Sequence, residues 1–161
     1  MNDTTQPQTP PDGTVPPQDG PAQPQQPQAA PTPPYVAPAP MLESDARTIA
    51  MLVHILAAVA IVVSAGTLAF LVPLIMWLIY RERSALVDWH GKTNLNLQLT
   101  SLAVIVAGFV LGLVTLGIGF IVTIPAMIGY AIYALVISIV AGVKANRGEY
   151  YRIPLVIPFI R

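Results

Sequence analysis

Two long stretches without a charged residue constrain this chain more than any other feature of its sequence. No Asp, Glu, Lys or Arg occurs from Thr48 to Tyr80, which is 33 residues, or from Thr93 to Val143, which is 51 residues. An apolar, uncharged stretch of about 18 residues or more is typical of a membrane-spanning helix. We therefore predict a helical membrane protein, and the pattern argues strongly against a soluble enzyme.

The first 40 residues have a different composition, because they contain 13 of the 17 prolines. Such a segment buries too little apolar surface to offset the entropy of ordering, and proline removes backbone donors. We predict a disordered Pro/Gln-rich tail over residues 1–43 and a membrane domain over residues 44–161. The tail contains a PxxP match at Pro31–Pro34 that could bind an aromatic groove. Any proline-rich tail produces such matches, so a solvated spacer is the simpler interpretation.

The first uncharged stretch is too long for one straight span. As a single helix it would measure about 50 Å, whereas the hydrocarbon core of a bilayer is about 30 Å thick. Gly66 and Pro73 favour a break in the helix. We expect two short helices over residues 46–64 and 67–82, forming a hairpin that need not cross the bilayer fully and could be re-entrant. One long kinked span is the alternative.

The second uncharged stretch is long enough for two crossings, and the segment Thr115–Gly119 supplies a turn between them. We expect helices over residues 86–114 and 120–143, followed by a C-terminal tail over residues 144–161. Polar residues alternate over residues 81–98, as they would in a strand, but a lone strand at a membrane surface would leave its backbone groups unpaired. The predicted fold class is therefore an all-α membrane protein with a four-helix transmembrane bundle.

Basic residues flank the predicted spans unevenly, which indicates an orientation. Apart from Arg47, at the start of the first predicted helix, they occur in the middle loop and in the C-terminal tail, and neither short turn has any; they are Arg81, Arg83 and Lys92, then Lys144, Arg147, Arg152 and Arg161. The positive-inside rule places both regions, and with four helices also the N-terminus, on the cytoplasmic side. The first apolar run begins only near Ile49 and no basic region precedes it, so we expect no cleaved signal peptide.

Few residues suggest chemistry. His54 lies inside a predicted span, where an ionisable residue is by default a functional hypothesis. Asp88 and His90 could bind a metal or act as acid and base, but two ligands do not make a site. The chain has no Cys, which excludes disulfides and thiolate chemistry. We expect no catalytic residue, metal or cofactor; the rival hypothesis is a small membrane transporter or membrane enzyme that uses His54, Asp88, His90 and Glu149.

One polar stripe is the strongest candidate for a functional feature. In a helix, His90, Asn94, Gln98 and Ser101 share a face, while Asp88 and Lys92 have ion-pair spacing. Amides without partners in hydrocarbon are costly, so we expect the stripe to face the interior of the bundle. Together with an aromatic and charged run in the tail, these residues form the predicted interaction surface, which comprises Asp88, His90, Lys92, Asn94, Gln98, Glu149, Tyr150, Tyr151 and Arg152.

Small residues recur at helical spacing in the last two predicted spans, where they let helices approach closely. They are Gly108 and Gly112, then Ala134, Ser138 and Gly142. We expect them to pack the bundle internally; a homo-oligomer is the alternative. The composition implies the lipid bilayer as a partner, and other membrane proteins could bind the polar middle loop or the Pro-rich tail. Nucleic acid is not expected, because the chain has no clustered basic face.

The sequence resembles a bacterial family of small membrane proteins of unknown function in three segments: Pro73–Thr100, the last hairpin and Lys144–Arg161. That family is grouped with the twenty-kilodalton membrane subunit of the chloroplast inner-envelope import translocon (Tic-twenty-like). The most specific pieces are Val87-Asp88 with His90-Gly91-Lys92, and the run Gly148–Arg152. The resemblance covers residues 44–161. It implies a multi-pass protein of the bacterial cytoplasmic membrane that acts as an interaction or scaffold component, by analogy in protein translocation or membrane insertion.

Overall fold

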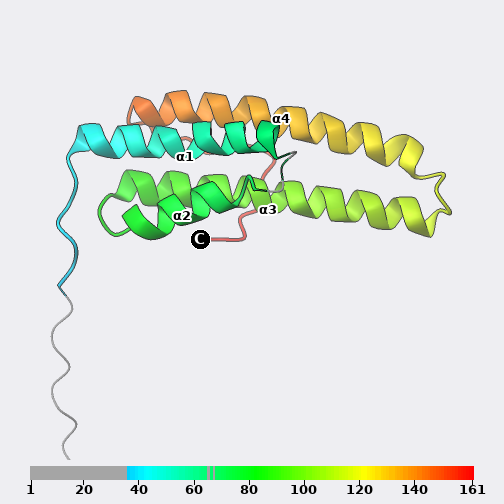
Figure 1. Cartoon of the computed structure of the whole chain (residues 1–161), viewed down its shortest axis with the longest axis horizontal. Helices are drawn as coiled ribbons and strands as arrows, with labels where there is room; N and C mark the ends of the chain where they lie inside the picture. Colours follow the sequence, from blue (N-terminus) through cyan, green and yellow to red (C-terminus); the bar gives the residue numbers. More distant parts are fainter. Residues whose placement is uncertain (1–35, 65, 67) are drawn as a thin grey trace, which may run out of the picture. The chain divides into compact units, whose positions relative to one another are not determined.

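The computed structural model describes residues 36–64, 66 and 68–161. Four helices form the described part of the chain, which contains no strand: α1 (Glu43–Val63), α2 (Leu71–Tyr80), α3 (Ala85–Val114) and α4 (Phe120–Asn146) (Figure 1). The predicted all-α, four-helix fold is therefore confirmed. The Pro-rich tail up to residue 35, with its Pro31–Pro34 motif, lies outside the described residues.

The first two helices form a hairpin and not one kinked span. α1 ends in a turn in which Gly66, at φ 87°, donates its N–H to Ile61 O at 2.9 Å. Glycine adopts this left-handed conformation without the cost that a side chain would add. Met41 N donates to Arg83 O at 3.2 Å, so the two ends of the hairpin lie together. Figure 1 shows α2 returning along the direction from which α1 came.

The second helix is shorter than predicted. Turn bonds such as Leu71 N to Leu68 O, at 3.1 Å, occupy the segment before it, so the regular helix begins only at Leu71. With 10 residues, α2 is about 15 Å long, half the thickness of the hydrocarbon core. By length and composition α1, α3 and α4 can each cross a membrane. The described chain therefore has three candidate spans and one short helix beside them.

Helix α3 begins where the sequence provides a cap. Ser84 has extended backbone angles, φ −157° and ψ 125°, and its hydroxyl accepts a hydrogen bond from Val87 N. Asp88 lies in the first turn, where a carboxylate interacts favourably with the helix dipole. The alternating polar residues after Ala85 are therefore helical, as predicted, and do not form a strand.

Most of the buried residues lie in the half of the bundle where α1 and α3 begin and α4 ends. Ala46, Ala50, Leu86, Val87 and Ala145 form one apolar cluster there, and alanines let α1 and α4 approach closely. Toward the other end, the α3–α4 hairpin extends beyond α1 and α2 (Figure 1) and exposes large apolar side chains. Such a surface suits lipid, which is as apolar as the side chains themselves.

The small residues of the last two helices pack inside the chain. A side chain at Gly108 would meet Met127 of α4, and one at Gly112 would collide with the ring of Phe120. Gly142 lies against Ile55 of α1. All five predicted packing residues are buried within this single chain, namely Gly108, Gly112, Ala134, Ser138 and Gly142.

Candidate functional site

The polar side chains of α3 meet α1 and the C-terminal segment, residues 147–161, in the half of the bundle where α1 and α3 begin and α4 ends, which we call the charged end. His54 of α1 and His90 of α3 are fully buried, with their ring centroids 5.1 Å apart and their planes nearly perpendicular. Asn94 is also fully buried, and Gln98 is almost so. We call His54, His90, Asn94 and Gln98, with the backbone carbonyl of Glu149, the histidine chain.

Each member of the histidine chain is hydrogen-bonded to the next. Gln98 Nε2 lies 3.3 Å from Asn94 Oδ1, and Asn94 Nδ2 lies 2.8 Å from His54 Nδ1. His54 Nε2 lies 2.9 Å from His90 Nδ1, and His90 Nε2 lies 2.9 Å from the carbonyl oxygen of Glu149. Asn94 Nδ2 also donates to the carbonyl of Val53 at 3.3 Å. The chain thus connects two helices to the start of the C-terminal segment.

The partners determine which ring nitrogens carry protons. A carbonyl only accepts, so His90 donates from Nε2 to Glu149 O, and its Nδ1 is the acceptor of a neutral ring. His54 must then donate from Nε2, which leaves its Nδ1 to accept from Asn94. Every hydrogen bond therefore runs in one direction, from Gln98 to Glu149. The arrangement is complete with both rings neutral, so it places no net charge inside the bundle.

The predicted inward orientation of the polar stripe is confirmed. His90, Asn94 and Gln98 are buried, while Ser101 is half-buried and donates to Leu97 O at 2.9 Å. The bonding partners come from α1 and from the segment after α4. The partner of His54 could not be identified from the sequence, because no pattern relates His54 to a residue 36 positions away.

The acid–base pair considered for Asp88 and His90 does not form. Asp88 accepts a hydrogen bond from Trp77 Nε1 of α2 and an ion-paired one from Lys92 Nζ, both at 2.7 Å. The i, i+4 spacing with Lys92 is thus used as predicted. The carboxylate of Glu149 pairs with Lys144 at 2.7 Å, and only its backbone carbonyl reaches His90. In the described part of the chain no group of three His, Cys, Asp or Glu could hold a metal ion.

Part of the predicted interaction surface lies inside the bundle. His90, Asn94 and Gln98 are buried because their polar groups bond within the chain, so they cannot contact an outside partner. The other members lie at the charged end and are at least partly exposed: Asp88, Lys92, Glu149, Tyr150, Tyr151 and Arg152. Whether these six bind another molecule stays a prediction.

A second polar face of α3, which was not predicted, holds the C-terminal segment in place. Asn96 pairs with the backbone of Ile160: its Nδ2 donates to Ile160 O at 2.9 Å, and its Oδ1 accepts from Ile160 N at 2.7 Å. Thr100, one turn further along, accepts from Ile157 N at 3.0 Å. The i, i+4 spacing of Asn96 and Thr100 was the available signal. The alternating polar residues thus serve two faces, one toward α1 and one toward the segment.

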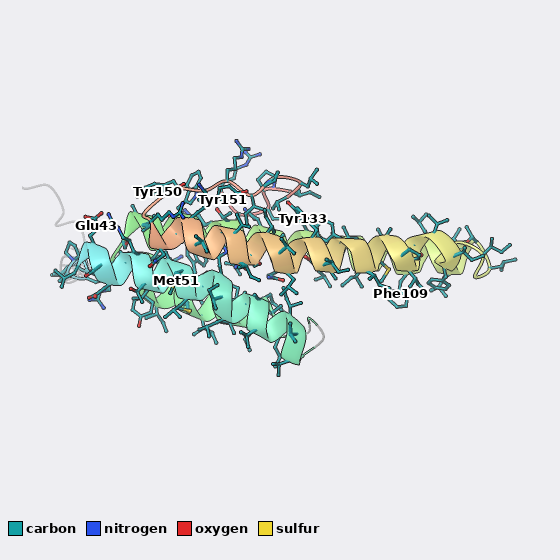
Figure 2. All side chains as sticks on the ribbon, turned by 90° about the horizontal axis from the view of Figure 1, so that it is seen from above. Glu43, Met51, Phe109, Tyr133, Tyr150 and Tyr151 are labelled. Atoms are coloured by element: carbon teal, nitrogen blue, oxygen red, sulfur yellow. The ribbon has the colours of Figure 1, made fainter. Side chains whose placement is uncertain are left out.

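Aromatic side chains complete this attachment. Trp89 Nε1 donates to Tyr151 O at 3.2 Å, and the hydroxyl of Tyr133 donates to Pro154 O. Tyr130 donates from its hydroxyl to Leu155 O at 3.2 Å. In Figure 2 the segment bearing Tyr150 and Tyr151 runs beside α4 and reaches the region of Tyr133. An irregular backbone beside membrane helices needs such partners, because lipid offers none.

Comparison with known proteins corrects the resemblance to the Tic-twenty-like family. No curated protein matches the chain, and no solved structure matches it. A different family model matches residues 45–160, so the Tic-twenty-like assignment is wrong and the link to protein translocation loses its support. The residues that suggested the Tic-twenty-like family have general roles: Asp88 stabilises a helix start, and the tail aromatics lie near the charged end of the bundle. Since the matched residues are most of the sequence, the chain belongs to the MamF/MmsF family, the magnetosome magnetite crystal formation protein family.

Proposed function

We propose that this protein acts in magnetite crystal formation as a non-catalytic interaction component of the magnetosome membrane, and that it influences the crystal without binding the mineral. The family match over residues 45–160 supports the process and the membrane. The distribution of charge supports the indirect role. All carboxylates of the described residues lie at the end of the bundle where α1 and α3 begin and α4 ends: Glu43, Asp45, Glu82, Asp88 and Glu149.

The orientation follows from the positive-inside rule. The same end of the bundle carries the basic residues, so we place it on the cytoplasmic side. The turn between α3 and α4 then faces the lumen of the compartment, where the crystal grows, and the turn after α1 points toward the same side (Figure 1). Neither turn contains a charged residue. Because oxygen ligands such as carboxylates are what hard metal cations prefer, these turns offer the mineral little to bind.

The hydrogen bonds of the bundle favour an interaction role over catalysis. Both nitrogens of His54 and of His90 are used inside the chain, so neither ring has a free site for a substrate. Asp88 and Glu149 are paired with Lys92 and Lys144. An enzyme would have to break these bonds before it could use the groups. The exposed residues at the charged end remain available for a partner protein on the cytoplasmic side.

Cysteine labelling tests the orientation on which this proposal depends, because the natural chain contains no Cys. Val36→Cys lies before α1 and Ile118→Cys lies in the α3–α4 turn, and both positions are highly exposed. On isolated intact magnetosomes a membrane-impermeant maleimide should label Val36→Cys at once and Ile118→Cys only after detergent is added. The opposite result would turn the carboxylates toward the crystal and overturn the indirect role.

The function itself is tested by deletion and complementation in a magnetosome-forming bacterium. Loss of the protein should change the size or shape of the crystals in electron micrographs, and the intact chain should restore them. Crosslinking in the same cells, followed by mass spectrometry, should recover other magnetosome proteins through the charged end. Crystals that do not change on deletion would contradict the proposal.

A proton-conducting transporter is the second candidate, and the histidine chain is the observation that favours it. The bonds from Asn94 through His54 and His90 to Glu149 O form a continuous path of exchangeable protons. Liposomes containing the purified protein and a pH-sensitive dye would test it. A proton flux that is lost in His54→Gln would favour the transporter; a flux no greater than that of empty liposomes would exclude it.

A further inference from the structure

The C-terminal segment and the first turns of α3 enclose a cleft of about 470 Å³ at the charged end of the bundle. Clefts of roughly 300–1,000 Å³ are the usual size for small-molecule sites. Its lining combines two kinds of side chain. The charged ones are Asp88, Lys92, Arg152 and Arg161, and the apolar ones include Trp89, Ile153, Val156 and Ile160.

The charges that line the cleft are not balanced. Lys92 pairs with Asp88 at 2.7 Å, which neutralises both. In the part of the chain that the structure describes, Arg152 and Arg161 have no ion pair or hydrogen bond from their side chains. The lining side chains therefore carry an excess of two positive charges. A guanidinium group presents donors in a planar fork that matches the oxygens of a phosphate.

The two arginines are held at the cleft by the bonds that attach the segment to α3. Arg152 directly follows Tyr151, whose carbonyl accepts from Trp89 Nε1 at 3.2 Å. Arg161 directly follows Ile160, whose backbone N–H and carbonyl both pair with Asn96. The segment therefore brings to one cleft two residues that would be far apart in an extended chain. Fixing the backbone in advance lowers the entropy lost when a ligand binds.

The apolar walls indicate what kind of phosphate would fit. Val156, Ile153 and Ile160 lie beside the arginines, so the same cleft offers contacts to hydrocarbon. Trp89 is 40% exposed and stacks edge-on against Tyr150 at 5.8 Å, as aromatic side chains do at the level of lipid headgroups. A soluble phosphate would not use these walls. Basic pockets beside membrane helices are typical sites for anionic lipid headgroups.

We propose that the cleft between α3 and the C-terminal segment binds the phosphate headgroup of an anionic phospholipid, with Arg152 and Arg161 as its phosphate contacts. The phosphate is paired with the two guanidinium groups, and the first part of an acyl chain lies along Val156 and Ile160. The site does not depend on the proposed role in crystal formation. Lipid binding there would make the stability of the C-terminal segment depend on the lipid composition of the surrounding membrane.

Thermal unfolding of the full-length protein in detergent, with defined lipids added, tests this site. Phosphatidylglycerol should raise the Tm of the natural protein more than zwitterionic phosphatidylcholine does. In Arg152→Gln/Arg161→Gln the half-maximal concentration of phosphatidylglycerol should rise about tenfold or more, because two charge-assisted bonds are lost. The control Arg83→Gln/Arg147→Gln removes the same charge at the same end but outside the cleft, and should behave like the natural protein.

A second variant, which keeps both arginines, tests the site independently in case the Arg152/Arg161 variant misfolds. Thr93 lines the cleft, so Thr93→Trp should fill it and weaken phosphatidylglycerol binding with both arginines present. An equal loss in the Arg83/Arg147 control, or no preference for phosphatidylglycerol over phosphatidylcholine, would overturn the proposal. Inorganic phosphate at millimolar concentration should give no comparable rise in Tm; if it does, the cleft is a site for free phosphate and the lipid assignment is wrong.

Discussion

Replacing His54 by Leu should destabilise the bundle far more than the loss of one hydrogen bond would suggest. The substitution removes the donor to His90 Nδ1 and the acceptor of Asn94 Nδ2, which lie at 2.9 and 2.8 Å. Both partners are fully buried, so water cannot replace the lost bonds. Each buried polar group without a partner costs about 1–3 kcal/mol, so the expected loss is about 2–6 kcal/mol. An average hydrogen bond between membrane helices contributes only about 0.6 kcal/mol.

The free energy of unfolding, measured by titration with sodium dodecyl sulfate in mixed micelles, checks this expectation. The control is Val110→Leu, which changes an exposed apolar side chain on α3 and should alter the free energy by less than about 0.5 kcal/mol. The double variant His54→Leu/His90→Phe should lose less stability than the sum of the losses in His54→Leu and His90→Phe, because both single substitutions break the same bond between the two rings. A loss of about 0.6 kcal/mol or less in His54→Leu, or strictly additive losses in the double variant, would refute the reasoning.

Three further substitutions test the other contacts. Asn96→Leu removes both bonds to the backbone near the end of the C-terminal segment. Trypsin should therefore cleave after Arg152 at least several-fold faster, as followed by mass spectrometry. Unchanged cleavage would mean that Asn96 does not hold the segment. Gly112→Ala should lower the free energy of unfolding by about 1–3 kcal/mol, because the new methyl group meets the ring of Phe120. Adding Phe120→Leu should recover most of this loss. The same loss with and without the second substitution would exclude the clash. Trp77→Phe removes the 2.7 Å bond to the partly exposed carboxylate of Asp88 and should lower the free energy of unfolding by about 1 kcal/mol in the same titration. An unchanged free energy would show that the bond adds nothing to stability.

The arrangement of helices could be predicted because charge and chain length leave few alternatives. Uncharged stretches longer than one bilayer crossing must break or turn, and Gly66 and the run Thr115–Gly119 were the candidate turns. The structure has its turns there, with Gly66 and Gly117 both at positive φ. The start of α3 was likewise predictable, because Ser84 and Asp88 provide a cap and a favourable first-turn charge.

The contacts between helices could not be predicted in the same way. Helical periodicity shows that His90, Asn94 and Gln98 share a face, but not which helix this face meets. The pairing of His54 with His90 depends on how α1 packs beside α3, and single-sequence patterns carry no such information. The role of Asn96 was missed because its partner is backbone, and a backbone carbonyl or N–H leaves no trace in the sequence of side chains.

The unequal length of the two hairpins has a geometric consequence for the membrane around them. At the charged end, four helices and the C-terminal segment lie side by side, whereas among the described residues only α3 and α4 continue to the opposite end (Figure 1). Placed across a bilayer with its charged end on one side, the domain would displace more lipid from that leaflet than from the other, as a wedge does. A wedge is accommodated with least distortion where its broad end lies in the outer, convex leaflet of a strongly curved membrane. If the charged end faces the cytoplasm, the surface that suits the wedge best is that of a small vesicle surrounded by cytoplasm, and many copies would together oppose flattening of that vesicle.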